Sequence, residues 1–205
     1  MAGKRRRGRP LGSDGANTRE EILRVARQVF SELGYERTTF QEIATRVGVT
    51  RPAVNHYFRD KAALYSALFD SVRDSVMGAS VNQATAQETL PGRLSAYLEA
   101  AVRIDSRDRS FARFIAASVL DGYRHEHLLG STGEQVEQVR GFVRQALGAA
   151  VESGEIRDDI DIPAVTEMLI AVMWGIAWYA GFIGTHDQLE EVVEQFSRLI
   201  AGILW

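Results

Sequence analysis

The stretch from residue 50 to residue 57 carries side chains that could read the edges of DNA bases. Arg51 supplies a guanidinium, which can donate two hydrogen bonds to guanine O6 and N7. Asn55 supplies an amide, which can pair with N6 and N7 of adenine, and Pro52 and Ala53 can contact a thymine methyl group. In a helix that buries Val54, the outward face would hold these four residues with Thr50, His56 and Tyr57.

A helix-turn-helix spanning Thr38–Lys61 would position this face. The expected first helix covers Thr39–Arg46, the turn contains Gly48, and the second helix covers Thr50–Tyr57. The expected buried residues are Ile43, Ala44, Val49, Val54 and Phe58. Spacing alone leaves a second interpretation open, in which the segment is a short helical hairpin inside any α-helical bundle.

Polar residues and glycines mark the expected helix ends. Thr39 and Glu42 have the spacing of a capping box, as do Thr18 and Glu21 at an earlier helix start. Thr50 suits an N-cap, with Pro52 tolerated in the first turn, and Asp60 suits the cap of a helix that begins at Lys61. Gly34 and Gly48 are expected to end their helices in a left-handed conformation.

Helical periodicity continues through the rest of the chain, without strands of period two. The further expected helices cover Pro91–Ile104, Ser110–Tyr123, Glu134–Glu152, Ile162–Ile183 and Asp187–Leu204, and residues 78–89 are expected to be looser. The pattern predicts an all-α fold of about nine helices, in which an N-terminal three-helix helix-turn-helix domain precedes a C-terminal antiparallel bundle. The expected division is a disordered basic arm at 1–16, a DNA-binding domain at 17–60 and a second domain at 61–205.

Charge is distributed unevenly along the 205 residues. Residues 1–61 hold 13 Lys and Arg against 7 Asp and Glu, whereas residues 62–205 hold 11 against 20. A basic N-terminal part is expected to meet a polyanion, and an acidic remainder is expected to avoid it. The chain contains no cysteine, which excludes disulfides and zinc-thiolate sites. It begins with charged residues rather than an apolar signal, so we expect a cytoplasmic protein.

Three segments resemble the DNA-binding domain of the TetR family of bacterial regulators. They read TFQEIA at 39–44, GVT at 48–50 and YFxxKxxL at 57–64, and Ile22, Ala26, Phe30 and Gly34 are similar to the family's first helix. The resemblance implies DNA binding, with phosphate contacts from Thr39, Thr50, Tyr57 and Lys61 and base contacts from Arg51, Pro52, Asn55 and His56. Many family members have an aromatic residue where Asn55 stands, which implies that the bases read differ.

The N-terminal arm contains a second basic motif. Arg7, Gly8, Arg9 and Pro10 resemble the core of an AT-hook, whose backbone lies deep in a narrow minor groove while its arginines follow the floor. The alternative is a solvated basic tail that adds only non-specific attraction. We therefore name Arg7 and Arg9 as candidate DNA contacts.

The resemblance weakens towards the C-terminus, where Gly154–Arg157 precede two long apolar helices. It implies that residues 61–205 bind a small molecule and form a dimer. The candidate pocket residues are aromatic or lie beside aromatic residues: Tyr97, Phe111, Phe114, Ile115, Ser118, Phe142, Trp174 and Trp178. The alternative is that these residues only pack the core. The helix from Lys61 to about Met77 would carry the ligand signal to the DNA-binding domain.

The last two helices are expected to form the homodimer interface. The candidate residues are Ala171, Gly175, Val192, Phe196, Leu199, Ile200 and Ile203. Residues 168–185 contain no charge, which is also the pattern of a short membrane span. Gly175, Gly181 and Gly184 interrupt that run, so we favour a soluble bundle without membrane contact.

Catalytic and metal-binding patterns are weak. His125 and His127 would point to different faces of a helix, so we expect a surface loop there and no metal site. The four histidines are scattered and no catalytic motif is present, so we expect neither an enzyme nor a cofactor. The expected function is a repressor that a hydrophobic or aromatic ligand releases from a palindromic operator. The alternatives are a ligand-independent nucleoid or division factor and an activator.

Overall fold

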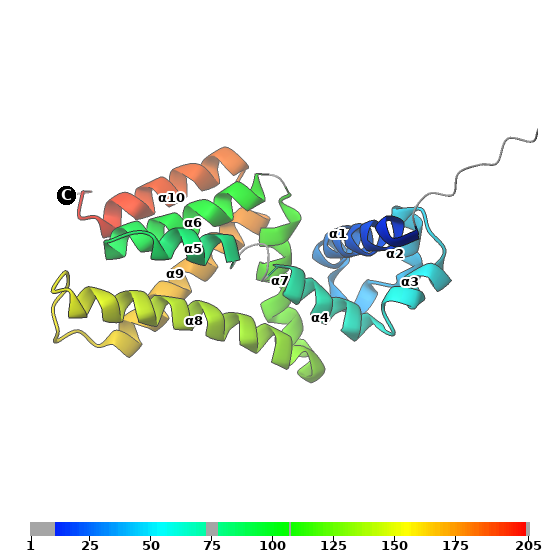
Figure 1. The fold of residues 1–205 in the computed structure, drawn as a ribbon, viewed down its shortest axis with the longest axis horizontal. Helices are drawn as coiled ribbons and strands as arrows, with labels where there is room; N and C mark the ends of the chain where they lie inside the picture. The colour runs from blue at the N-terminus through cyan, green and yellow to red at the C-terminus, as the bar shows by residue number, and fades with distance from the viewer. Residues whose placement is uncertain (1–10, 73–77, 107, 204–205) are drawn as a thin grey trace, which may run out of the picture.

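The computed structural model describes residues 11–72, 78–106 and 108–203 and confirms the all-α class. Within these residues it contains ten α-helices, one 3₁₀ helix and no strand. The helices are α1 (Leu11–Arg37), α2 (Phe40–Val47), α3 (Arg51–Tyr57), α4 (Lys61–Val72), α5 (Gly78–Thr85), α6 (Leu90–Asp105), α7 (Ser110–Arg124), η2 (Glu126–Leu128), α8 (Leu129–Glu152), α9 (Ile162–Phe182) and α10 (His186–Ile200). Figure 1 shows two lobes, which we call the head (α1–α4) and the body (α5–α10), with α7 at the junction.

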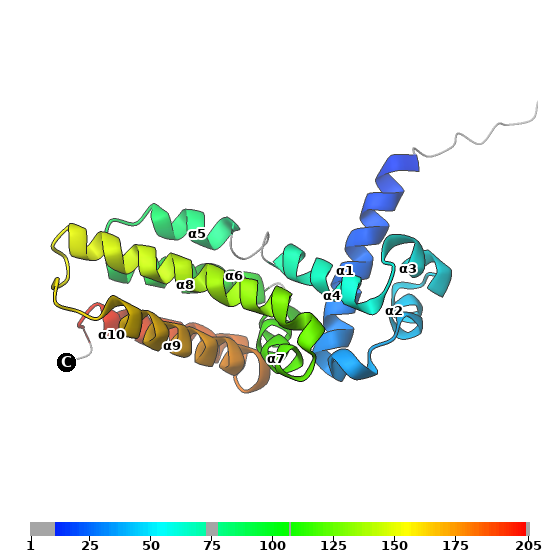
Figure 2. The same cartoon turned by 90° about the horizontal axis from the view of Figure 1, so that it is seen from below.

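Apolar stripes on α1, α2, α3 and α4 meet in one core that holds the head together. Ile22, Ile43, Val54 and Leu64 are fully buried there, one from each helix. The same core takes in Phe114 from α7, so it extends across the junction into the body. Figure 2 shows that α1 runs steeply across the direction of α8 and α9, and that the C-terminal part of α1 lies beside α7.

The body is a bundle in which α5, α6, α8, α9 and α10 run roughly along one direction (Figures 1 and 2). A second core fills it, built around residues such as Leu98, Val143, Leu147, Met173 and Leu189. Within one helix the buried residues recur at helical spacing, as Val139, Val143 and Leu147 do on α8, and such stripes make the body's main helices visible in the sequence. The predicted antiparallel bundle is present.

The first helix begins earlier than predicted. It starts at Leu11, so residues 11–16 are helical rather than disordered, and Thr18 lies inside the helix instead of capping it. Adding residues to an existing helix gains one hydrogen bond for each residue fixed, so a helix can extend into a polar sequence once its core turns are held. Gly15, in this added part of α1, lies close to the end of α3, since a Cβ on it would be 3.7 Å from the Tyr57 hydroxyl.

Other element ends differ from the sequence expectations. Residues 78–85, expected to be loose, form α5, and Ala84 on this helix is fully buried. Tertiary packing of this kind stabilises a short helix that its own propensities would leave marginal. The helix α8 begins at residue 129 rather than 134, and α10 ends at residue 200 rather than 204. With α5, the part of the chain that the structure describes holds ten α-helices, against about nine predicted.

Candidate DNA-reading face and ligand pocket

The two helices of the helix-turn-helix, α2 and α3, begin at the capping residues predicted for them. The Thr39 hydroxyl accepts a hydrogen bond from the Glu42 N–H at 3.2 Å, and the Thr50 hydroxyl accepts one from the Ala53 N–H at 3.4 Å. Gly48 takes a φ of 80° at the end of α2, and its N–H donates to the Ala44 carbonyl. Glu42 does not complete a capping box, because its carboxylate accepts from Arg46 instead. These caps fix the direction in which α3 leaves the turn.

The outward face of α3 presents the residues predicted to read bases. Arg51, Pro52, Asn55 and His56 are exposed, while Val54 on the opposite side is fully buried. Figure 1 places α3 at the outer end of the head, away from the body. This face is therefore open to a DNA groove, as direct readout requires. Arg7 and Arg9 lie outside the described residues.

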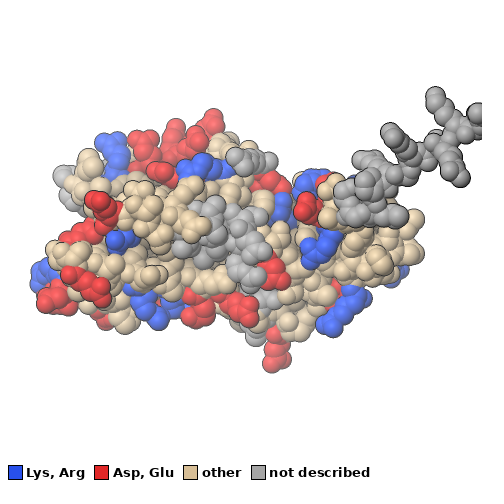
Figure 3. Space-filling view, viewed as in Figure 1, with Lys and Arg blue, Asp and Glu red and all other residues tan. Residues whose placement is uncertain are grey.

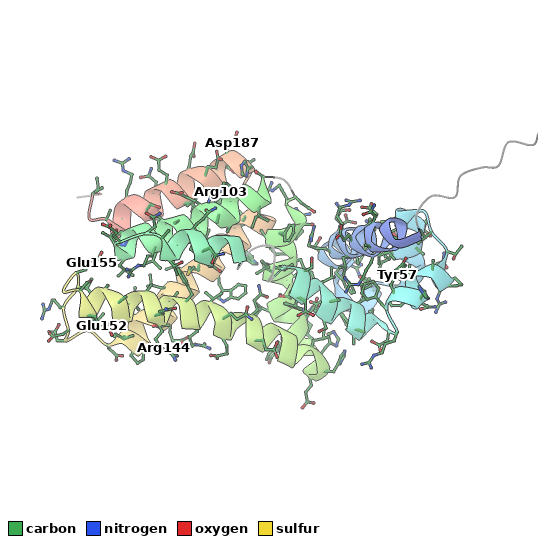
Figure 4. All side chains as sticks on the ribbon, in the orientation of Figure 1. Tyr57, Arg103, Arg144, Glu152, Glu155 and Asp187 are labelled. Atoms are coloured by element: carbon green, nitrogen blue, oxygen red, sulfur yellow. The ribbon has the colours of Figure 1, made fainter. Side chains whose placement is uncertain are left out.

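Tyr57 and Lys61, predicted as phosphate contacts, also take part in the packing of the head. Tyr57 is half-buried between α3 and α1 (Figure 4). The Lys61 ammonium donates to the carbonyl oxygens of Tyr35 at 2.7 Å and Glu36 at 3.0 Å. It therefore satisfies carbonyls at the C-terminal end of α1, where a cation is electrostatically favoured. Thr39 and Thr50, the other predicted phosphate contacts, are exposed at the helix starts that they cap.

The body contains an apolar pocket enclosed by α6, α7, α8, α9 and α10 and by the end of α4. Its empty volume is about 870 Å³, part of which is open to solvent. The lining residues are apolar or aromatic apart from Gln135 and the hydroxyl of Tyr97; none is charged. Burial raises the pKa of Tyr97 to about 12, so this hydroxyl is neutral at physiological pH. The chemistry of the lining suits an uncharged, largely apolar molecule.

Four of the eight predicted pocket residues line this cavity: Tyr97, Phe111, Ile115 and Trp174. Phe114 does not line it, because its ring packs 5.3 Å from Tyr65 and 5.2 Å from Phe69 in the head core. Ser118 does not line it either, because it is buried and its hydroxyl donates to the Ile115 carbonyl.

The other two candidates, Phe142 and Trp178, lie outside the lining because of the direction of their side chains. Phe142 stacks on Tyr97 at 4.8 Å between ring centroids and so lies behind the pocket wall. Trp178 is 52% exposed and faces out of α9. Sequence reasoning missed Val72, Met173 and Gln135, which line the pocket. In the sequence, their apolar or amide side chains do not distinguish a pocket-lining residue from one that only packs the core.

The predicted dimer residues divide into exposed and packed groups. Ala171, Gly175, Leu199 and Ile203 are exposed, whereas Val192, Phe196 and Ile200 are half-buried. Phe196 and Ile200 pack against the body core. Sequence reasoning missed further exposed apolar side chains, which are Met168, Val172, Trp178, Phe182 and Ile183 on α9 and the following turn, and Val119, Leu120 and Tyr123 on α7. Exposed apolar side chains gathered on two helices that pack together, as α7 and α9 do, are typical of an interface.

Charge is distributed over the surface as the sequence indicates. Figure 3 shows acidic side chains gathered along the edge of the body that carries α10. That helix contains Asp187, Glu190, Glu191 and Glu194 (Asp187 is labelled in Figure 4). The body therefore repels a nucleic-acid backbone at this edge.

The two histidines of the α7–α8 connection pack against the head rather than forming a free surface loop. The Nε2 atom of His127 lies 3.0 Å from the Tyr35 hydroxyl, and Nδ1 of His125 lies 3.4 Å from the Glu36 carboxylate. Both rings are within 6 Å of the Tyr35 ring. No group of three side chains that could hold a metal ion occurs among the residues described.

The helix-turn-helix with an exposed reading face, joined to a helical body, defines a DNA-binding regulator. Residues 22–68 match the family model described as bacterial regulatory proteins of the tetR family. Residues 84–196, more than half of the chain, match the tetracyclin repressor-like C-terminal domain. The chain belongs to the TetR family of transcriptional regulators, whose members are DNA-binding proteins and not enzymes.

Individual proteins agree with this assignment. The chain is 28% identical over 189 residues to the transcriptional repressor AcnR of Corynebacterium glutamicum, covering 89% of this chain and 92% of AcnR. It is 26% identical over 167 residues to the nucleoid occlusion factor SlmA of Vibrio vulnificus, covering 80% and 82%. FadR of Bacillus subtilis, solved with stearoyl-CoA, has the same fold, with a TM-score of 0.76, 17% identity and coverage of 91% and 99%.

One described helix, α9, is long and apolar enough to cross a membrane. One side of it packs in the body core through Leu169, Ile170 and Met173, and residues 84–196, which include it, match the C-terminal domain of the family. The length and composition of α9 are thus compatible with a membrane span, whereas its packing and the family match favour a helix of the body bundle.

Proposed function

We propose that the chain is a homodimeric repressor that leaves a palindromic operator when a small uncharged, largely apolar molecule fills the body pocket. The observation that carries this proposal is the pocket, which offers about 870 Å³ of empty volume and a lining without charged side chains. A core that served packing alone would be filled nearly to crystal density. An apolar lining with a few polar groups, here Gln135 and the Tyr97 hydroxyl, is typical of small-molecule sites.

The apolar face of α9 supports a dimer. Met168 and Trp178 are 56% and 52% exposed, and Gly175 between them leaves room for close approach of a second helix. One recognition helix gives weak contact with a half-site, whereas two helices about 34 Å apart read both halves of a palindrome. We therefore assign the last two helices of the body to the interface, with Ala171 and Gly175 near its centre.

The lining also limits the effector. Gln135 and Tyr97 can orient one or two polar groups of a ligand, and the remaining walls offer only apolar contact. A carboxylate or phosphate would lose its hydration without gaining a cationic partner there. A neutral aromatic or aliphatic compound fits this chemistry best. Like the regulators that it resembles, such a protein would work in the cytoplasm, where both DNA and metabolites are accessible.

The test begins with selection of an operator from a random duplex library by the full chain. Fluorescence anisotropy then measures operator affinity while a panel of neutral and charged compounds is added. We expect at least one neutral apolar compound to weaken operator binding, and Ala101→Trp, which fills the pocket in place of a ligand, to weaken operator binding without any compound. Gly141→Ala, on α8 and outside the pocket lining, is the matched control. Failure of every compound that binds the pocket would contradict ligand release.

The similarity to SlmA favours a second candidate, a ligand-independent nucleoid or division factor. The same experiment separates the two. A ligand-independent factor would hold its sites whatever occupies the pocket, and its sites would be scattered along the chromosome. An activator would share the reading face and differ only in the effect of operator occupancy on transcription.

A further inference from the structure

A buried arginine of the head sits on a residue that lines the pocket. Arg27 of α1 is only 5% exposed, and its guanidinium carbon lies 3.5 Å from the centroid of the Phe111 ring. Phe111 belongs to α7 and lines the pocket. It also packs against the head core, so it touches both structures at once. A single ring thus separates the guanidinium from the space that a ligand would fill.

The guanidinium is held in place by two side chains at the start of α7. Its Nε donates to the Ser110 hydroxyl at 2.8 Å, and its Nη2 donates to Asp108 Oδ2 at 2.6 Å. The other oxygen of Asp108 accepts from the Ser110 backbone N–H at 2.9 Å. Because the carboxylate joins Arg27 to the first turn of α7, a shift of that turn changes every hydrogen bond of the guanidinium.

Both members of the pair are charged at neutral pH. Burial lowers the pKa of Arg27, and Asp108 opposes this shift. Burial alone would raise the pKa of Asp108, but its hydrogen bonds with Ser110 and Arg27 outweigh that effect and hold it below the usual value. A buried ion pair is sensitive to small displacements, because losing one partner leaves a desolvated charge.

The first turns of α7 are also tied to the far wall of the pocket. Arg109 donates to the carbonyl oxygens of Ala180 and Gly184, both at 2.6 Å, and Arg113 donates to that of Gly181 at 2.9 Å. Ala180 itself lines the pocket. Expansion of the pocket therefore pulls on the same turn of α7 that seats Arg27.

We propose that Arg27 is the residue that transmits pocket occupancy to the head. A ligand that displaces Phe111 removes the ring on which the Arg27 guanidinium stacks and disturbs the hydrogen bonds of the guanidinium with Ser110 and Asp108. The head then loses the orientation that the operator requires. This inference deepens the proposed function and rests on it for the operator. It places the main link at the contact of α1 with α7, whereas the sequence suggested α4, which reaches the pocket through Val72.

The test uses 1-N-phenylnaphthylamine, a neutral apolar dye, as the pocket probe. Energy transfer from tryptophan, reduced in Trp174→Phe, shows that the dye occupies the pocket. Two readouts follow on the full chain: amide hydrogen exchange of residues 22–30 and affinity for the selected operator. The variants are Arg27→Met and the double variant Arg27→Met with Asp108→Asn, which removes both charges and so avoids a buried unpaired carboxylate. Arg24→Met is the matched control, since Arg24 is exposed and pairs with Glu21 on the same helix.

We expect the dye to accelerate exchange at residues 22–30 at least fivefold, roughly the lower limit of ordinary allosteric coupling, in the unaltered chain and in Arg24→Met. We expect no acceleration in the double variant, although the dye still binds. An equal acceleration in the double variant would overturn the role of Arg27 while leaving ligand release intact. No acceleration in the unaltered chain with dye bound would also overturn it. Arg27-dependent acceleration with unchanged operator affinity would support the link and contradict the proposed function.

Discussion

The ammonium of Lys61 lies 4.3 Å from the centroid of the Tyr35 ring while donating to the Tyr35 carbonyl oxygen at 2.7 Å. This contact joins the N-terminal end of α4 to the C-terminal end of α1, two segments that enclose the helix-turn-helix. The residue that the family pattern assigns to DNA therefore has a second, structural role. The two roles can be separated by experiment.

Lys61→Met should lower the free energy of unfolding by about 1–2 kcal/mol, because it removes charge-assisted hydrogen bonds and a cation–π contact. Chemical denaturation without DNA measures this loss. If Lys61 also binds phosphate, the slope of log affinity against log salt should fall by about one unit in the variant. Loss of stability with an unchanged salt slope would restrict Lys61 to the structural role.

Arg51→Ala and Asn55→Ala should each relax base preference at one position of the operator half-site. The expected loss of discrimination is about 1–3 kcal/mol, since both side chains are exposed on α3 and can pair bidentately with a base. Competition binding with single-base operator variants measures it. Arg59→Ala is the control, because Arg59 is exposed beyond α3 and should affect all sequences alike. Unchanged preference in both alanine variants would refute their assignment as base readers.

Trp178→Glu should shift the dimer towards monomer. The indole is 52% exposed on the apolar face of α9, and a charge buried in an interface without a partner costs several kcal/mol. Sedimentation velocity over a concentration series measures the shift. Gln145→Glu, at an exposed position of α8, adds the same charge outside the two helices assigned to the interface and should leave the dimer intact. Identical behaviour of the two variants would move the interface elsewhere.

Gly181→Ala should destabilise the body, because a Cβ there would lie 2.9 Å from the Arg113 Cα on α7. Overpacking of this kind costs about 1–3 kcal/mol. Gly141→Ala has no neighbouring atom within 4 Å and should instead stabilise α8 by about 0.5–1 kcal/mol. Thermal unfolding of both variants gives the comparison. A neutral Gly181→Ala would mean that α7 and α9 can separate easily.

Asp108→Asn should remove part of the acid sensitivity of the fold. The pKa of Asp108 is lowered in the folded chain, so its contribution is complete above the unfolded value of about 4 and is lost as the pH falls through the folded value. At pH 7 the variant should be about 2 kcal/mol less stable. That gap should close as the pH falls below about 4. Urea denaturation between pH 3 and pH 7 measures it, with the exposed Asp158→Asn as control. A gap that stays constant with pH would contradict the ion pair.

Features that depend on a few neighbouring residues were predictable from the sequence. The caps at Thr39 and Thr50, the left-handed Gly48 and the burial of Val54 follow from local chemistry, and the structure confirms them. Gly34 has a positive φ of 75° but marks a kink, and α1 continues past it to Arg37. The physical causes of the confirmed features act within one or two turns of chain. The same locality explains why the family resemblance is sharpest in this segment.

Features that depend on tertiary packing were not predictable. Phe111 and Phe114 are three residues apart on α7, yet one lines the pocket and the other enters the head core. Because α7 lies between two cores, both faces of this helix are apolar and the sequence does not distinguish them. The helix α5 and the early start of α1 likewise depend on partners distant in the sequence. The contact of Arg27 with Asp108 spans 81 residues and has no local signature.

That contact has a consequence for how such regulators diversify. Exchange of DNA-binding segments between relatives is one route to a new operator, and a crossover near residue 60 would fall between α3 and α4 and leave every described helix intact. Such a hybrid would nevertheless separate position 27 from positions 108 and 110, which are matched to it. A transplanted segment without an arginine there would leave a carboxylate unneutralised at the join. Functional hybrids are therefore expected to inherit or restore all three positions together.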